Sequence, residues 1–257
     1  MEYISTRNKN LQFGFKEIFL QGLAPDGGLF ISKNIKKYSN NELNKMAKLN
    51  YIDLAKEIVS NFCEKDLHGK ELEDIIKKSY SNFSVKNVVN IKKIGKFSLV
   101  ELFHGPTLAF KDIAMQPIGN IYDEFNKSNN KKINVIVATS GDTGSAAISA
   151  LNGKSNLNVF VLHPDKKISN IQRRLMTTVE SKNVFNIALK GNFDDCQKIV
   201  NRIFICLVII VMAIFLVGCH TTKWEWFPQK DRTITPSPFT KGAEEPSETV
   251  DVLKVSF

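Results

Sequence analysis

The stretch "INVIVATSGDTGSAAISALNG" (133–153) decides the fold of this chain. Residues 133–140 form a nearly continuous apolar run, which is typical of a strand covered on both faces of a parallel sheet. Residues 141–153 turn through glycines and continue as a run of small residues that favours a helix. A strand that leads directly into a helix predicts one unit of an α/β sheet.

The same alternation extends in both directions along the chain. Further strands are predicted at 97–103 ("FSLVELF"), 158–163 ("NVFVLH") and 183–191 ("NVFNIALKG"). Further helices are predicted at 112–125, at 169–179 behind a Ser169/Gln172 capping box, and from about Asp194. This order predicts an α/β domain over 96–202 with an open, mostly parallel sheet and right-handed crossovers.

Residues 1–95 predict a smaller, mainly helical N-terminal domain. Ser39 and Glu42 form a capping-box pattern, and 51–62 and 70–83 carry apolar residues at helical spacing. We expect these stripes to form a core rather than a site. The polar start "MEYISTRNKN" predicts no N-terminal signal peptide.

The composition argues against several classes of function. The 257 residues are 43% hydrophobic and 24% charged, which is ordinary for a globular protein, and their net charge is +9. The lysines are scattered in pairs without interleaved aromatic residues, so a nucleic-acid-binding surface is not expected. The cysteines show neither CxxC nor Cys/His spacing, which argues against a zinc site and a disulfide framework; they are Cys63, Cys196, Cys206 and Cys219.

Two loops are predicted at the edge of the sheet where ligands bind. In open α/β sheets, ligands sit beyond the carboxyl ends of the strands. The loop "TSGDTGS" (139–145) lies there, at a helix start whose dipole favours an anion, and Gly141 and Gly144 would let backbone N–H groups approach one. A plain tight turn is the alternative. The loop "HGPTLAFKD" (104–112) also follows a predicted strand and precedes a helix, so we expect it at the same edge.

Lys111 is the candidate reactive group in the second loop. It is either an ordinary surface lysine or an amine held in a pocket by the apolar run before it. At a helix start the dipole disfavours a cation, so Lys111 needs an anionic partner or a chemical role. A buried lysine loses up to ~3–5 units from a pKa of ~10.4. Its free amine can then form a Schiff base with an aldehyde cofactor, and pyridoxal phosphate combines such a lysine with an anion-binding loop.

The segments "ELFHGPTLAFKD" (101–112) and "ATSGDTGSAA" (138–147) closely resemble threonine synthase, a pyridoxal-phosphate enzyme of the tryptophan-synthase-β-like fold. The resemblance extends over roughly residues 3–201. It implies cytoplasmic localisation and conversion of O-phospho-L-homoserine and water to L-threonine and phosphate. It also implies that Lys111 is the Schiff-base lysine and carries protons between substrate carbons. The residues implied to hold the substrate and border the cofactor ring are Ser140, Gly141, Asp142, Thr143 and Gly144.

Some roles stay open at this stage. Asp142 could orient the cofactor's phenolic oxygen or the substrate. His104 is either a histidine that packs its loop or a catalytic group, and His68, His163 and His220 have no assigned role. No metal site is predicted.

The C-terminal quarter departs from the family. Residues 203–219, "IFICLVIIVMAIFLVGC", are an unbroken stretch of 17 apolar residues, at the lower edge of the length that spans a membrane. The stretch ends like a lipoprotein lipobox at Cys219. The alternative is a buried core helix. Residues 220–257 are polar and rich in Pro, Ser and Thr, which predicts an extended, disordered tail.

The chain is also shorter than the family. Threonine synthases continue for roughly as many residues again, including a glycine-rich loop that cups the cofactor phosphate. After Gly191 this chain has only Gly218 and Gly242, in no such loop. We therefore expect a truncated threonine synthase that could be inactive, or alternatively a chimeric, membrane-anchored, lipoprotein-like chain.

Overall fold

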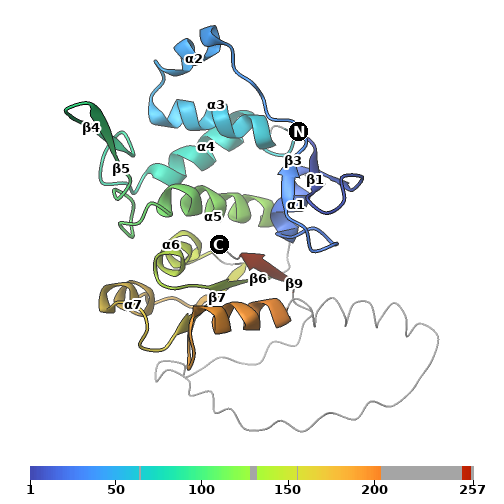
Figure 1. Ribbon diagram of the computed structural model, residues 1–257, viewed down its shortest axis with the longest axis vertical. Helices are drawn as coiled ribbons and strands as arrows, with labels where there is room; N and C mark the ends of the chain where they lie inside the picture. The colour runs from blue at the N-terminus through green and yellow to red at the C-terminus, as the bar shows by residue number, and fades with distance from the viewer. Residues whose placement is uncertain (64, 128–131, 155, 204–250, 256–257) are drawn as a thin grey trace.

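The computed structural model describes residues 1–63, 65–127, 132–154, 156–203 and 251–255 (Figure 1). Within them lie a helical N-terminal part with a small antiparallel sheet, a protruding hairpin, and a parallel sheet flanked by helices. The chain is therefore a mixed α/β protein, as the sequence predicted.

The N-terminal part combines helices with short strands. Its helices are α1 (Phe15–Gln21), α2 (Asn40–Met46), α3 (Tyr51–Cys63) and α4 (Gly69–Tyr80). Helix α1 and a small sheet of order β2-β1-β3 were not predicted from the sequence. This sheet consists of β1 (Tyr3–Ser5), β2 (Gln12–Phe13) and β3 (Phe30–Ser32). These strands have two or three residues each, which is too short for an alternating pattern to show. The capping box of Ser39 and Glu42 is confirmed.

The prediction of a buried parallel strand at 97–103 is wrong. Strand β5 (Phe97–Glu101) pairs antiparallel with β4 (Asn90–Ile94) in a separate two-stranded hairpin, and only Glu101 of β5 is buried. The apolar run resembles a covered strand, but no described element covers it. The turn of this hairpin contains the expected domain boundary at 95/96, and the division into domains remains a prediction.

The parallel sheet has the order β8-β7-β6-β9, and all its pairs are parallel. Three strands lie where the sequence predicted them: β6 (Ile133–Ala138), β7 (Leu157–Pro164) and β8 (Val184–Leu189). The fourth, β9 (Asp251–Val255), pairs with β6 and belongs to the segment expected to be an extended tail. That expectation did not anticipate this strand, and residues 220–250 lie outside the described part.

Helices cover both faces of this sheet (Figure 1). The helices α5 (Asp112–Asn126) and α6 (Asp142–Leu151), together with Met176 of α7 (Asn170–Thr177), form one core with alternate residues of β6 and β7. The opposite face packs against Cys196 and Val200 of a helix over 193–203. Coverage of both faces explains the continuous apolar runs of the strands.

Helix α5 joins the two parts of the molecule. Met115 and Tyr122 face the core of the sheet, whereas Ile121 and Phe125 face the core of the N-terminal helices. One helix with two apolar faces therefore belongs to both cores, which makes their relative position depend on it.

Helices α5 and α6 lie unusually close together. A Cβ atom added to Gly119 would lie 2.4 Å from the carbonyl oxygen of Ala150. Gln116 donates a hydrogen bond from Nε2 to Oγ of Ser149, at 3.2 Å. Glycine permits this approach because it lacks a side chain, and the contact holds the two helices in a fixed register.

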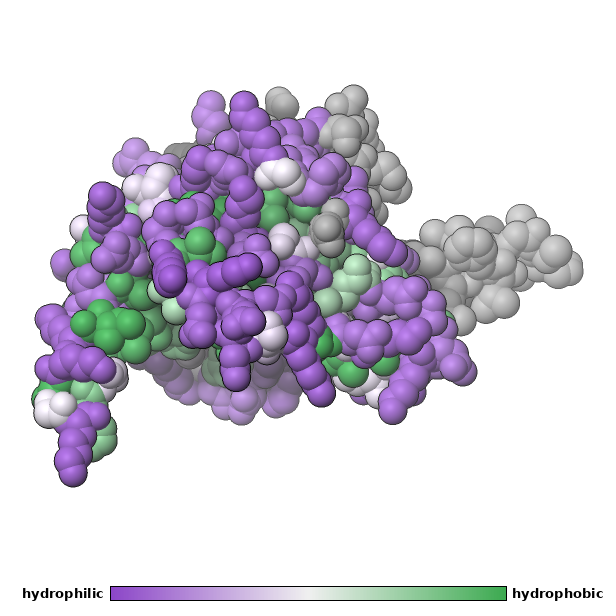
Figure 2. All heavy atoms as spheres, turned by 90° about the horizontal axis from the view of Figure 1, so that it is seen from above, coloured by the Kyte–Doolittle hydropathy of each residue, from purple (hydrophilic) through white to green (hydrophobic). Residues whose placement is uncertain are grey.

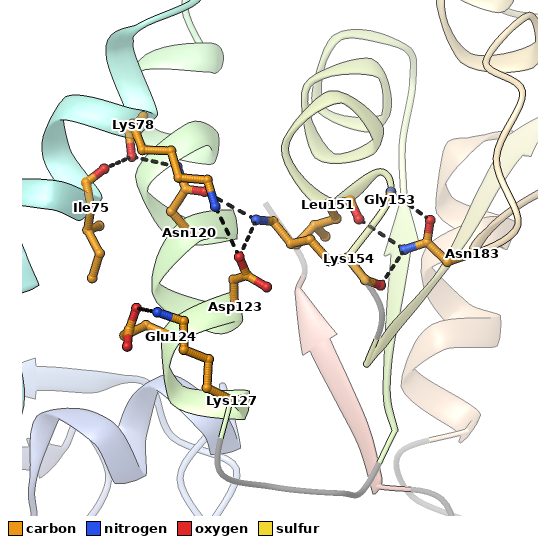
Figure 3. A network of polar contacts seen from close by, with 11 residues as sticks. Ile75, Lys78, Asn120, Asp123, Glu124, Lys127, Leu151, Gly153, Lys154 and Asn183 are labelled. Atoms are coloured by element: carbon orange, nitrogen blue, oxygen red, sulfur yellow. Dashed lines mark hydrogen bonds and ion pairs between the residues drawn. The ribbon is translucent and has the colours of Figure 1, made fainter.

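A polar network strengthens the same junction (Figure 3). The Lys154 ammonium, from the turn between α6 and β7, lies 3.3 Å from Oδ2 of Asp123 and donates to Oδ1 of Asn120 at 3.1 Å. Lys78 of α4 contacts the same Asp123 carboxylate at 3.2 Å. Burial lowers the pKa of Lys154, whose side chain is only 10% exposed. Burial would raise the pKa of Asp123, but the two ammonium groups lower it overall.

No helix in the described part of the chain is long and apolar enough to cross a membrane. The predicted membrane-type segment 203–219 lies outside the described residues except for Ile203.

Gly119→Ala should destabilise the protein by about 1–3 kcal/mol, because the new methyl group has no room against the Ala150 carbonyl. Urea unfolding would measure this loss. Gly14→Ala is the control, since its Cβ would meet nothing within 4 Å, and it should cost below about 1 kcal/mol. Equal stability of Gly119→Ala and the unmodified chain would contradict a tight junction.

Candidate functional site

The loop after β6 is held by one buried hydroxyl group. Oγ1 of Thr139 accepts hydrogen bonds from the N–H groups of Gly141 at 3.0 Å and Gly144 at 2.8 Å. Thr139 is almost fully buried, and its own N–H donates to the carbonyl of Leu162 in β7. The loop is therefore tied both to itself and to the neighbouring strand.

Both glycines of this loop are required because a side chain would not fit at either position. Gly141 has φ of +143°, and a Cβ there would lie 2.4 Å from Cδ of Gln172. A Cβ on Gly144 would lie 2.5 Å from Cγ2 of Thr139 and 2.7 Å from Sδ of Met176. Their own N–H groups donate to Oγ1 of Thr139, so any approach of this loop to an anion, which remains a prediction, would use other N–H groups.

Other groups at the start of α6 remain available to a ligand. The first N–H groups of a helix have no partner within it, which leaves those of Asp142 and Thr143 at this end. Ser140 is exposed, and Asp142 and Thr143 are half-buried. The macrodipole adds positive potential there. Anion recognition by this loop is therefore possible through Asp142 and Thr143, with Ser140 beside them.

The loop 104–112 is locked around a buried carboxylate. Asp112 is fully buried, and its two oxygens accept from the N–H and the hydroxyl of Thr107, each at 2.8 Å. Gly105 lies so close that a Cβ would be 2.4 Å from Cβ of Asp112. Leu108 adopts φ of +59°, which is unfavourable for a residue with a side chain. These contacts fix the backbone immediately before Lys111.

Lys111 is the N-cap residue of α5, and its amine faces the other loop. Nζ lies 4.0 Å from Oδ2 of Asp142 and 4.2 Å from the ring centroid of Phe110. The anionic partner that the sequence analysis required is therefore Asp142. The side chain is 27% exposed, so the described residues do not close the apolar pocket that was expected around it.

The structure brings the predicted loops together for a different reason from the one expected. The strand before Lys111 belongs to the hairpin and not to the parallel sheet, so the loop 104–112 is not at the sheet edge through its own strand. Instead, α5 packs alongside α6 through Gly119 and Ala150. Lys111 and Asp142 lie eight residues before this contact on their respective helices, which run in parallel register.

Asp142 is oriented by the next helix. Nε2 of Gln172, in α7, donates to Oδ1 of Asp142 at 2.6 Å, which leaves Oδ2 toward Lys111. Oε1 of Gln172 accepts from Ser169 in the predicted capping box, which is confirmed. The sequence predicted only this capping role for Gln172, because the Asp142 carboxylate that accepts from its amide lies 30 residues away along the chain.

His104 lies in a polar cluster with Glu101, the last residue of the hairpin, and Ser84. Its Nε2 is 3.1 Å from Oε2 of Glu101 and its Nδ1 is 3.5 Å from Oγ of Ser84. Lys92 forms an ion pair with Glu101, and this contact holds the pKa of the buried Glu101 carboxyl below its usual value, with His104 contributing. These contacts favour the alternative in which His104 packs its loop over the one in which it is catalytic. The role of His104 remains a prediction.

The structure describes two further histidines, His163 and His68. His163 is buried in β7, burial lowers its pKa, and its Nδ1 has no partner among the described residues. His68 is the N-cap residue of α4. Within the described ranges, no group of three or more His, Cys, Asp or Glu side chains is arranged to hold a metal ion.

Comparisons with known proteins identify relatives of this chain. Residues 2–80 match the family model "Threonine synthase N terminus". The threonine synthases of Pseudomonas aeruginosa and Saccharomyces cerevisiae are 38% and 43% identical to the chain over 79% of its length. These matches cover 44% and 42% of the two relatives, so the chain spans less than half of their length.

Solved structures give the same result. A PLP-bound threonine synthase from Brucella melitensis matches 79% of the chain with a TM-score of 0.73 and 34% identity. The yeast enzyme matches with the same TM-score and 41% identity. The matches cover 44% and 43% of those chains, respectively. The arrangement described above is therefore similar to part of these structures.

Thr139→Val should cost about 1–3 kcal/mol of stability, because it leaves two buried N–H groups without an acceptor. Thr139→Ser keeps the hydroxyl group and should retain more of the stability than Thr139→Val. Hydrogen exchange of Gly141 and Gly144 would distinguish a loosened loop from a general loss of packing. Unchanged exchange in Thr139→Val would show that the hydroxyl does not hold the loop.

Proposed function

Because this chain is a homologue of threonine synthase over 79% of its length, corresponding to the N-terminal part of that family, we propose that it supplies part of a pyridoxal-phosphate active site. The supporting observation is the position of Lys111, whose amine lies 4.0 Å from Asp142 at the start of α6. The reaction is the conversion of O-phospho-L-homoserine and water to L-threonine and phosphate. The sheet and its helices then belong to the tryptophan-synthase-β-like fold.

The residues present fit one side of the cofactor. Lys111 presents a partly exposed amine, and Asp142 supplies a polar group beside it with its orientation fixed by Gln172. Pyridoxal phosphate, when bound, supplies an aldehyde for the lysine amine and a ring that withdraws electrons from the substrate. A glycine-rich cup for its phosphate is missing after Gly191 in this sequence. The cofactor therefore needs groups beyond those of this chain.

Each residue of the site has a chemical role in this proposal. The Lys111 amine, released when substrate takes its place, carries protons at the reacting carbon atoms, because it remains within reach of them. Ser140 and the N–H groups of Asp142 and Thr143 hold the anionic substrate at the positive end of α6. Gly141 and Gly144 let the loop backbone lie close to Gln172 and Thr139, where a side chain would not fit. Asp142 directs Lys111 and borders the cofactor.

The alternative function, a membrane-anchored lipoprotein-like chain, depends on residues 203–219. Apart from Ile203 they lie outside the described part of the chain, so only the sequence supports that alternative. The position of the Lys111 amine beside Asp142 favours the proposed pyridoxal-phosphate site over this alternative.

Lys111→Ala should abolish cofactor attachment in a fusion protein that joins residues 1–202 to the unmatched C-terminal part of the yeast threonine synthase. The visible absorption of lysine-bound pyridoxal phosphate should disappear, and threonine formation should fall at least about 100-fold. Lys48→Ala, in the exposed turn after α2, is the control and should keep both. Persistence of both signals in Lys111→Ala would refute the assignment.

The 257-residue chain by itself should not form threonine. Fewer than half of the residues of its relatives are represented, and large apolar side chains remain exposed, including Phe97 and Leu108. Each such side chain gains ~1.5–3 kcal/mol on burial, which favours association. Phosphate release from O-phosphohomoserine would measure activity. Turnover by the purified monomer with pyridoxal phosphate would contradict the proposal.

A further inference from the structure

The capping box of α7 leaves one hydrogen-bond donor for use outside its helix. Oε1 of Gln172 accepts from the Ser169 hydroxyl at 2.9 Å and from the Ser169 N–H at 3.4 Å. In return, the Ser169 hydroxyl accepts from the Gln172 N–H at 3.2 Å. The capping box of Ser39 and Glu42 has the same reciprocal bonds, but a carboxylate there takes the place of the amide. Only the box of α7 therefore has a side-chain NH2 group to offer.

The contacts of the Gln172 amide determine which of its ends faces Asp142. A backbone N–H only donates, so the end near Ser169 is the oxygen, and an ionised carboxylate only accepts, so the end near Asp142 is the NH2 group. Nε2 accordingly donates to Oδ1 of Asp142 at 2.6 Å. Without the Ser169 hydroxyl, only the long bond from the Ser169 N–H would oppose a half-turn of the amide. That half-turn would bring oxygen against carboxylate.

Packing fixes where the amide lies but not which end points where. A Cβ on Gly141 would be 2.4 Å from Cδ, 2.7 Å from Oε1 and 2.8 Å from Nε2 of Gln172. The amide thus lies directly on the backbone that precedes Asp142. A half-turn keeps the amide in this place and exchanges its two ends, so its orientation depends on the hydrogen bonds with Ser169.

The Asp142 carboxylate transmits this constraint to Lys111. Gln172 donates to Oδ1, and Oδ2 lies 4.0 Å from Nζ of Lys111. Among the described residues, Lys111 forms an ion pair with no other carboxylate. A carboxylate stabilises a neighbouring ammonium group, and an amine must lose its extra proton before it acts as a nucleophile. The orientation of Asp142 therefore affects how readily the Lys111 amine reacts.

We propose that Ser169 is a positioning residue for the Lys111 amine. Its hydroxyl fixes the Gln172 amide, the amide fixes the Asp142 carboxylate, and the carboxylate holds Lys111. Ser169 acts through these two groups and not by contact with a reacting atom. Only the catalytic role of Lys111 rests here on the proposed function, since the contacts themselves involve no cofactor.

The test measures how fast acetic anhydride acetylates Lys111 in the full chain. Hydrophilic side chains cover most of the face drawn in Figure 2, so many surface amines react as well and the rate is read peptide by peptide in a mass spectrometer. The exposed Lys9 gives the reference rate. Ser169→Ala should raise the rate at Lys111 about two- to fivefold, the range expected when a partly exposed ion pair is lost. Asp142→Asn should raise it by a similar factor.

Three further variants separate positioning from helix capping. Glycine is nearly as good an N-cap residue as serine, so Ser169→Gly should leave α7 folded and still raise the rate as Ser169→Ala does. Ser169→Thr keeps a hydroxyl group and should keep the original rate. Ser39→Ala removes the matching capping box at α2 and should leave the rate at Lys111 unchanged.

A double variant tests whether Ser169 acts through Asp142. In the Asp142→Asn background, Ser169→Gly should add nothing, whereas independent effects would multiply. An unchanged rate in Ser169→Gly, or the same increase in both backgrounds, would overturn the proposal. So would an equal increase in Ser39→Ala, because the rate would then report a general loss of helix stability.

Acetylation and cofactor attachment distinguish this proposal from the proposed function. The fusion protein described above reports attachment of pyridoxal phosphate through its visible absorption. If the fusion protein attaches no cofactor while acetylation follows the expected pattern, the proposed function fails and the positioning role of Ser169 remains. Cofactor attachment together with acetylation that is independent of Ser169 would do the reverse.

Discussion

The close approach of α5 to α6 at Gly119 is the constraint on which the rest of the structure depends. A helix interior normally disfavours glycine by about 1 kcal/mol relative to alanine, but here the missing side chain admits the Ala150 carbonyl. Because the two helices pack in parallel register, their first residues also lie side by side. Lys111 and Asp142 meet for this reason, although neither lies near Gly119 along its helix.

The electrostatics of the site follow from that register. Two helix starts lie next to each other, and each dipole raises the positive potential where Lys111 carries its charge. Asp142 offsets part of this potential, and Gln172 holds its carboxylate in place. The hydroxyl of Thr139 meanwhile occupies the N–H groups of both loop glycines. The loop is thus held by its own hydrogen bonds, and in the proposed site Asp142, Thr143 and Ser140 are the residues left to bind a ligand.

Apolar residues are well covered in the parallel sheet but exposed in the hairpin. The parallel sheet is covered on both faces, and Lys154 ties it through Asp123 to the N-terminal helices. The hairpin β4–β5, by contrast, exposes apolar residues on both faces next to Lys111. The described elements therefore cover both faces of the parallel sheet but not those of the hairpin.

The sequence by itself determined the α/β class, three parallel strands, the helices after them and both capping boxes, because periodicity and capping depend on neighbouring residues. It also predicted Lys111 and the loop 140–144 as candidate site residues, through motifs that are local as well. Only the tertiary structure decided that β5 leaves the parallel sheet, that Thr139 occupies the glycine N–H groups, and that Gly119 sets the distance from Lys111 to Asp142. These features arise from contacts between residues far apart in the chain, and a one-dimensional pattern does not record which distant surfaces meet.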